Sequence, residues 1–197
     1  MIFQFGQFTI DVDVDKTREF YTSAEHISEG CECPGCRNYE KAVDFLSAEI
    51  PTFFDSLGVD MKKAAEVWAI MANSDGSVYY TGFYHLCGKL LSCENNQVEK
   101  STNEKRRGFS QWEASRNYSL TEDYNITFFD ECGSLIEKDF PLPIFEIEVE
   151  ANIPWVLNEE NIYADKPKKQ SFAAPTSIAP KPSVISRFKR WLSGFIT

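Results

Sequence analysis

Apolar and polar residues alternate at the start of the chain. Phe3 and Phe5 share one face of an extended chain, and Phe8 and Ile10 share one after a slip in phase at Gly6-Gln7. Side chains in a strand point to opposite faces in turn, and glycine tolerates the bulge that would restore one buried face. We therefore predict a strand over Ile2–Ile10 that contains a β-bulge at Gly6-Gln7.

Helical spacing replaces this alternation in the following segment. Three helices are predicted there: Lys16–Tyr21, a helix beginning at Arg37, and a short helix from Pro51 that Gly58 ends. The second is the clearest, because Tyr39, Val43 and Leu46 recur at i, i+4 and i+7 and so lie on one face. Proline at the first helical position and glycine after the last support the third helix.

Strand patterns dominate from Glu66 to Leu157. Two apolar runs flank Asn73-Ser74-Asp75-Gly76, which predicts a hairpin turn. A strand is predicted within "NYSLTEDYNITFFDEC", and residues 145–153 alternate most regularly. The polar positions of that last strand are predicted to face solvent, and they include Glu146, Glu148 and Glu150.

The order of these elements predicts an α+β fold. We expect a mostly antiparallel sheet, with helices between the first strand and the rest, in a compact domain over residues 1–157. Residues 158–182 are rich in Pro, Lys, Ala and Ser and are predicted to form a linker. Residues 183–197, "SVISRFKRWLSGFIT", combine apolar residues at helical spacing with three basic ones, which predicts a basic amphipathic helix.

Charge supports this boundary and narrows the range of partners. The chain of 197 residues has a formal net charge of −10, which disfavours binding to nucleic acid. The segment after Leu157 nevertheless holds seven Lys/Arg and only three Asp/Glu. We therefore expect the helix over 183–197 to bind a protein partner or an anionic membrane, or to pack on the core.

The N-terminal stretch lacks the basic segment of a secretory signal, and the apolar runs are too short to span a bilayer. We expect a cytoplasmic protein, peripheral to a membrane where the C-terminal helix binds lipid. Cysteines in that compartment are usually free thiols or metal ligands.

Three of the six cysteines lie in "EGCECPGCRNYEKA", at Cys31, Cys33 and Cys36. Zinc prefers tetrahedral sites of sulfur and nitrogen ligands, and this spacing allows three thiolates to reach one ion. Pro34-Gly35 allows the chain to turn back between the second and third ligand. We therefore predict a zinc site that stabilises the domain, with no role in catalysis.

A tetrahedral site needs a fourth ligand. A ligand from outside the cluster is slightly favoured, because it would connect the cysteine-rich loop to the sheet, and Cys132 is the candidate that we name first. The alternatives are His85 and Cys87, which share a strand face, and also Cys93 and His26. The sequence does not choose among them.

Other interpretations of the same residues remain. Cys33-Pro-Gly-Cys36 before a helix is also the arrangement of thiol–disulfide redox proteins, although the βαβ context is missing. A zinc-dependent hydrolase that uses His85 is a further alternative. His85 is otherwise expected to be a hydrogen-bonded histidine in or beside the sheet, and the cysteines to be thiols without metal.

Four segments together carry a resemblance: "ISEGCECPGCRNYEKA", "GFYHLCG", "ECGSLIEKDFP" and "IEVEANIPWVL". They resemble an uncharacterised family of small bacterial proteins with a C-x-C-x-x-C-R-N motif. The resemblance covers most of residues 1–157 and implies a compact cytosolic domain, without implying an activity. The segment after Asn158 is not part of the pattern.

Overall fold

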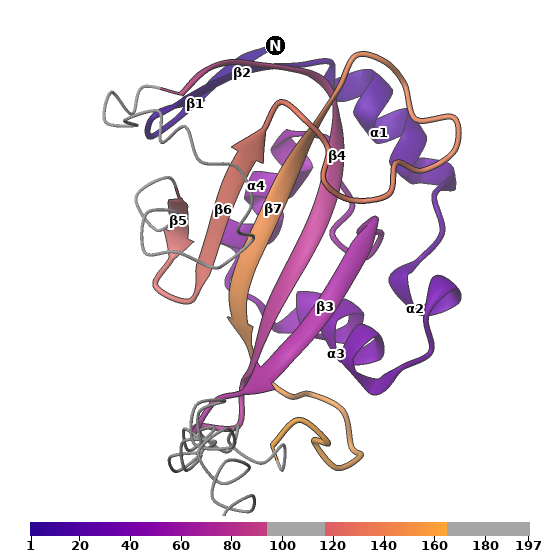
Figure 1. The fold of residues 1–197 in the computed structure, drawn as a ribbon, viewed down its shortest axis with the longest axis vertical. Coiled ribbons are helices and arrows are strands. Elements are labelled where there is room, and N and C mark those ends of the chain that lie inside the picture. The colour runs from indigo at the N-terminus through magenta and orange to yellow at the C-terminus, as the bar shows by residue number, and fades with distance from the viewer. Residues whose placement is uncertain (94–116, 165–197) are drawn as a thin grey trace, which may run out of the picture. The chain divides into compact units, whose positions relative to one another are not determined.

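The computed structural model describes residues 1–93 and 117–164, which form an α+β fold around an antiparallel sheet (Figure 1). The strands are β1 (Ile2–Phe5), β2 (Phe8–Val12), β3 (Glu66–Ala72), β4 (Val78–Cys93), β5 (Tyr118–Thr121), β6 (Tyr124–Phe129) and β7 (Ile144–Ile153). The helices are α1 (Val14–Ser23), α2 (Ile27–Gly30), α3 (Pro34–Ala42), the 3-10 turn η1 (Val43–Phe45) and α4 (Glu49–Ser56). The predicted fold class is confirmed for these residues, while the predicted helix over 183–197 lies outside them.

The long strand β4 organises the sheet. The strand order is β1-β2-β4-β7-β6-β5, and β3 also pairs with β4. On one edge of β4, its first part (78–83) pairs with β3 and its last part (88–93) pairs with β2. The opposite edge pairs with β7 from Val78 to Cys87. One 16-residue strand therefore joins three others.

Helix α1 completes the edge of β4 where no strand pairs with it, between β3 and β2. The Thr17 hydroxyl accepts from the Cys87 backbone N–H at 3.1 Å, and the Asp13 N–H donates to the Cys87 carbonyl at 2.8 Å. The Tyr21 hydroxyl bonds both the N–H and the carbonyl of His85, each at 3.2 Å. Because buried backbone groups need partners, these side chains make an unpaired stretch of strand stable in the interior.

The main core lies between the sheet and helices α3 and α4. Alternation along β4 directs the Tyr84 side chain towards these helices, where its hydroxyl lies 3.0 Å from that of Tyr39 in α3. The Tyr84 hydroxyl also donates to the Met61 carbonyl at 2.8 Å. The Phe54 ring of α4 packs on the Tyr84 ring, with 5.0 Å between the ring centroids. Buried tyrosines thus fill the core and satisfy their hydroxyls inside it.

Two predicted strands are in fact hairpins. Gly6 and Gln7 form a tight turn between β1 and β2, so the prediction of one bulged strand over Ile2–Ile10 was wrong. Gly6 has φ of 54°, which glycine adopts without the cost that a side chain brings. The predicted strand within residues 117–132 likewise divides into β5 and β6, which pair antiparallel. In both cases a short turn reverses the chain.

All three helices begin earlier than predicted. Helix α1 begins at Val14, two residues before Lys16. Helix α3 begins at Pro34 and not at Arg37, because the Cys33 sulfur caps it by accepting from the Cys36 N–H at 3.4 Å. Proline is well suited to that first position, where its missing N–H has no helical partner to lose. Helix α4 begins at Glu49, two residues before Pro51.

Asn38 ties α3 to the segment that follows β7. Its side chain is fully buried, and its amide group donates to the Tyr80 hydroxyl at 3.2 Å and to the Pro154 carbonyl at 3.1 Å. Its side-chain oxygen accepts from the Val156 N–H at 2.7 Å. One amide therefore satisfies three groups from two distant parts of the chain.

We predict that Asn38→Ala lowers the free energy of unfolding by about 2–4 kcal/mol, because it leaves buried polar groups without partners. Urea unfolding of the full chain measures this. Asn125→Ala is the matched control, since Asn125 accepts one exposed hydrogen bond from Ser119. A loss for Asn38→Ala no larger than for the control would contradict the assigned role.

Candidate metal centre

The cysteine cluster lies where α2 ends and α3 begins. Cys31 follows the last residue of α2, Cys33 caps α3, and Cys36 lies in its first turn. Their three sulfur atoms all lie within 4.8 Å of one another. The predicted proximity of these thiols is confirmed, and they form a candidate metal site.

Tight packing around Gly35 holds this turn in place. A Cβ atom at Gly35 would lie 2.6 Å from the Tyr163 hydroxyl and 2.8 Å from the Ala69 Cβ. Both distances are too short for non-bonded atoms, so only glycine allows α3 to approach β3 this closely. The Gly35 carbonyl also accepts from the Tyr80 hydroxyl at 3.1 Å. The turn is therefore fixed by the sheet and by the segment after β7.

The two thiols of the C-x-x-C pair have different environments. Partial burial raises the pKa of the Cys33 thiol, but hydrogen bonds from the Cys36 backbone N–H and neighbouring groups outweigh it and lower the pKa overall. Burial raises the pKa of the Cys36 thiol strongly, and hydrogen bonding to Cys33 raises it further. Cys33 is exposed and Cys36 is buried. Cys33 is thus the thiol that more readily becomes a thiolate.

Arg37 holds the outer side of the cluster. Its guanidinium donates to the Glu32 carbonyl and forms an ion pair with Glu159, which comes after β7. Arg37 and Asn38 together connect the first half of α3 to the segment after β7, at residues 154–159. The Arg-Asn pair of the motif therefore has a structural role here.

The structure does not bring a fourth predicted ligand to the triad. Among the Cys, His, Asp and Glu side chains of residues 1–93 and 117–164, none joins the three sulfurs within 4.8 Å. Cys132, the candidate named first, lies instead with His85 and Glu146. The Cys87 sulfur donates weakly to the Leu142 carbonyl at 3.8 Å, and His26 lies 3.3 Å from the Glu40 carboxylate.

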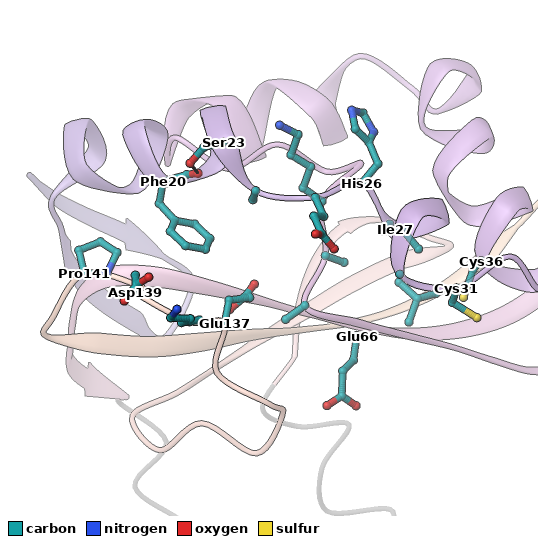
Figure 2. Close-up of a pocket in the computed structure, with 18 of the residues that line it drawn as sticks. Phe20, Ser23, His26, Ile27, Cys31, Cys36, Glu66, Glu137, Asp139 and Pro141 are labelled. Atoms are coloured by element: carbon teal, nitrogen blue, oxygen red, sulfur yellow. Dashed lines mark hydrogen bonds between the residues drawn. The ribbon is translucent and has the colours of Figure 1, made fainter.

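A groove of about 970 Å³ begins beside the triad. Cys31 and Cys36 line one end of it, Asp139 and Pro141 lie at the other, and Glu137 lies between them, as Figure 2 shows. Residues of α1 and α2 form one wall, and residues 63–68 leading into β3 form the other. The groove thus extends from the cysteine cluster towards a second group of polar side chains.

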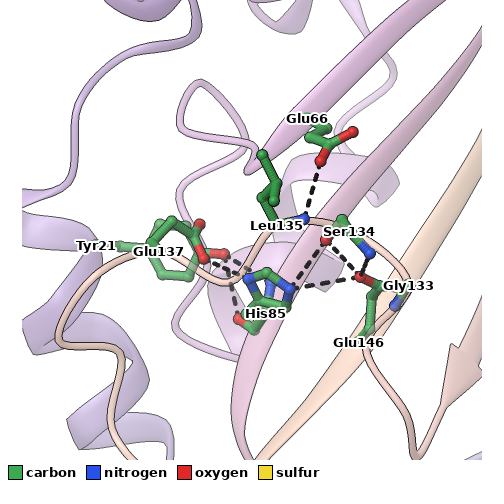
Figure 3. A network of polar contacts seen from close by, with 8 residues as sticks. All are labelled: Tyr21, Glu66, His85, Gly133, Ser134, Leu135, Glu137 and Glu146. Atoms are coloured by element: carbon green, nitrogen blue, oxygen red, sulfur yellow. Dashed lines mark hydrogen bonds and ion pairs between the residues drawn. The ribbon is translucent and has the colours of Figure 1, made fainter.

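This second group surrounds His85 on the face of β4 opposite to Tyr84 (Figure 3). His85 is completely buried, and its Nδ1 atom contacts the Glu137 carboxylate. Its Nε2 atom lies 3.0 Å from the Ser134 hydroxyl and 3.4 Å from the Glu146 carboxylate. The ligand atoms of Cys132, His85 and Glu146 all lie within 4.8 Å of one another. The expectation of a hydrogen-bonded histidine in the sheet is confirmed.

Glu146 holds the loop that covers it. Its carboxylate accepts from the backbone N–H of Gly133 and of Ser134, each at 3.0 Å, and from the Ser134 hydroxyl. Its side chain is buried, so the prediction that this position of β7 faces solvent was wrong. The loop from 131 to 137 covers this end of the sheet, and strand alternation carries no information about such a cover.

Burial lowers the pKa of the His85 ring, but hydrogen bonds that the ring donates to the carboxylates of Glu137 and Glu146 outweigh it and raise the pKa to about 9. Burial raises the pKa of Glu146, while bonds from His85 and Ser134 lower it overall. A Ser134–His85–Glu137 chain resembles the layout of a hydrolase triad. The Ser134 hydroxyl, however, donates its single proton to the Glu146 carboxylate and not to His85, which differs from the serine–histidine bond of such a triad.

Ser134 and Glu137 are functional-site residues that the sequence pattern did not predict. Both lie in "ECGSLIEKDFP", a polar stretch between strands in which little periodicity exists. A usable signal was the predicted position of His85 in a sheet, because a buried imidazole needs partners for both ring nitrogens. Which loop supplies them depends on tertiary structure.

Comparisons with protein-family models, curated proteins and solved structures found no match to this chain. The resemblance to the C-x-C-x-x-C-R-N family therefore stays a prediction. In the part of the chain that the structure describes, no helix is long and apolar enough to cross a membrane. The candidate sites themselves are the basis for a functional proposal.

We predict that the free energy of unfolding of the chelator-treated protein falls as pH rises through about 9. The folded protein binds the His85 proton more tightly than the unfolded chain does, since an unperturbed histidine has a pKa of 6.5. The stabilisation is therefore complete below pH 6.5 and is lost above about 9. Urea unfolding across this range measures it. Glu137→Gln should flatten the profile, and an unchanged slope in that variant would contradict the prediction.

Proposed function

We propose that this chain is a zinc-stabilised binding module. Zinc would be held by Cys31, Cys33 and Cys36, and the groove beside them would receive a ligand. The observation that supports this most directly is the preassembly of three sulfur atoms within 4.8 Å at the junction of α2 and α3. Three thiolates with this spacing suit zinc better than they suit harder cations.

The geometry of the triad is close to that of a zinc site. Sulfur atoms bound to a tetrahedral zinc at about 2.3 Å are about 3.8 Å apart. The observed sulfurs therefore need shifts of no more than about 1 Å to reach it. Cys31 and Cys33 are exposed, so their side chains have room to make these shifts. Zinc would join α2, a helix of only four residues, to α3.

The adjoining groove supports a binding role. Its volume of about 970 Å³ lies at the upper end of the range for ligand pockets. Apolar side chains such as Phe20, Ile27 and Trp68 line it together with Lys63 and Glu66. This mixture suits an extended peptide with apolar and charged side chains. Zinc at Cys31 and Cys36 would then stabilise one end of the binding surface.

A thiol–disulfide redox protein is the second candidate. The observation that favours it is the contrast between an exposed Cys33 with lowered pKa and a buried Cys36 with raised pKa. A nucleophilic thiolate at a helix N-cap with a buried resolving thiol is the arrangement such enzymes need. The third thiol, Cys31, has no required role in that chemistry, which is why zinc is preferred. A zinc-dependent hydrolase using His85 receives less support, because His85 is separate from the triad.

The C-terminal segment would add a second contact. We propose that the basic amphipathic helix predicted over residues 183–197 binds an anionic membrane, with a protein partner as the alternative. The support is the sequence pattern of apolar residues with Arg187, Lys189 and Arg190. Each basic residue near an anionic surface contributes about 1 kcal/mol to such binding.

We predict about one zinc ion per chain at the triad, and a lower melting temperature after chelation, because zinc binds only the folded arrangement. Metal analysis and thermal unfolding of freshly reduced full-length protein measure these quantities. Cys33→Ser should lose this ion while keeping a residue that caps α3. Cys93→Ser is the matched control, since Cys93 lies in β4 and belongs to neither group.

Retention of this ion by Cys33→Ser would contradict the zinc site. A wild-type protein without zinc that forms a reversible Cys33–Cys36 disulfide, with faster alkylation of Cys33 at neutral pH, would favour the redox protein instead.

We predict that reversing three charges in the tail, Arg187→Glu, Lys189→Glu and Arg190→Glu, weakens binding of the full chain to vesicles with anionic lipid at least about tenfold. The loss follows from the removal of attraction and the addition of repulsion at the surface. Vesicle co-sedimentation measures it. The matched control reverses three linker charges, Lys166, Lys168 and Lys169.

Equal loss in both charge-reversed proteins would show general electrostatic attraction, and would contradict a specific role for the predicted helix. If the wild-type chain does not bind the vesicles, the proposal of membrane binding is contradicted and a protein partner is the alternative.

A further inference from the structure

We infer that His85, Cys132 and Glu146 form a second metal centre, for zinc or a similar divalent cation. The three residues come from β4, from the loop before β7 and from β7 itself. Their ligand atoms all lie within 4.8 Å of one another. This centre is independent of the cysteine triad proposed above.

The separation of two of these ligands matches a tetrahedral site. With zinc–nitrogen and zinc–oxygen bonds of about 2.0–2.2 Å, two ligands of one ion are about 3.3–3.5 Å apart. The His85 Nε2 atom and the Glu146 carboxylate oxygen are 3.4 Å apart. The Ser134 hydroxyl bonds both of these side chains, and an ion bound by the His85 Nε2 atom would replace its contact with that nitrogen.

The other ring nitrogen of His85 has the partner that a metal-bound histidine usually has. The Nδ1 atom contacts the Glu137 carboxylate. A carboxylate in this position holds the ring orientation and directs Nε2 towards the metal. Figure 3 shows the ring between Glu137 on one side and Ser134 and Glu146 on the other. The ring is also fixed through its backbone, because the Tyr21 hydroxyl bonds the N–H and the carbonyl of His85.

The charges of the group favour a cation. Glu137 and Glu146 carry two negative charges, and His85 supplies at most one positive charge in return. Glu146 is buried, and a negative charge has a high free energy in a medium of low dielectric constant. A cation next to this carboxylate lowers that free energy. A divalent ion with a Cys132 thiolate would neutralise the group more fully than a proton on His85 does.

Cys132 is the member of the group that the metal-free arrangement does not explain. His85 and Glu146 hold the loop through hydrogen bonds, but the Cys132 sulfur makes no hydrogen bond to any residue that the structure describes. Its side chain is half-buried, which leaves access for an ion from the surface. Nitrogen, sulfur and oxygen ligands together favour zinc over magnesium or calcium.

The experiment measures metal stoichiometry and cobalt spectra of the full chain after reconstitution with Zn²⁺ or Co²⁺ alone. The wild type should bind two ions per chain. Cys132→Ala and Cys33→Ser should each bind one, and the double variant should bind none. The cobalt bound to Cys33→Ser should show thiolate charge transfer that disappears with Cys132→Ala. Because Cys132 makes no structural bond, Cys132→Ala should melt like the wild type in chelator.

Two further variants separate a metal site from a hydrogen-bonded loop. Ser134→Ala removes the hydroxyl that bridges His85 and Glu146, and should lower stability while the second ion is retained. His85→Gln should remove the second ion.

If Cys132→Ala binds as many ions as the wild type, the second centre is overturned. If one ion binds to the wild type and only Cys33→Ser removes it, the second centre is overturned while the triad stands. If only Cys132→Ala removes it, the triad fails and the second centre stands.

Discussion

The alternation of side chains along β4 is the constraint on which the rest of the structure depends. Because neighbouring residues of a strand point to opposite faces, Tyr84 and His85 must enter different environments. Tyr84 joins the core between the sheet and the helices, where Tyr39 bonds it. His85 enters a polar group that is covered by the loop before β7. The N–H and carbonyl of His85 lie at an edge of β4 without a strand partner, and the hydroxyl of Tyr21 in α1 bonds both.

The two groups of ligand atoms are built in different ways. The triad lies within residues 31–36, so the turn through Pro34 and Gly35 brings its sulfurs together locally. Contacts of Gly35 with Ala69 and Tyr163 then fix that turn against the sheet. The His85 group instead draws on three separate segments and exists only when β4 and β7 are paired. The first group therefore depends on one local turn, and the second depends on the pairing of strands within the sheet.

The groove connects the surroundings of the two groups. Cys31 and Cys36 line one end, and Glu137, which also contacts His85, lies farther along it. Glu66 belongs to the same lining and accepts from the Leu135 N–H at 2.9 Å, so it ties the covering loop to β3. A ligand in the groove would thus contact residues that are bonded to both groups. The position of the groove next to both groups is the reason that we propose a binding role for this surface.

The sequence by itself determined the fold class, the hairpin at residues 73–76 and the proximity of Cys31, Cys33 and Cys36, because all of these follow from local periodicity, turn residues and short spacing. It did not reveal the reversals at Gly6-Gln7 and within residues 117–132, since a tight turn and a bulge leave similar patterns of alternation. Only the tertiary structure decided that Glu146 is buried, and that Cys132 joins His85 and not the triad. Those outcomes depend on which loop covers which face of the sheet, and that choice is made by contacts between residues far apart in the chain.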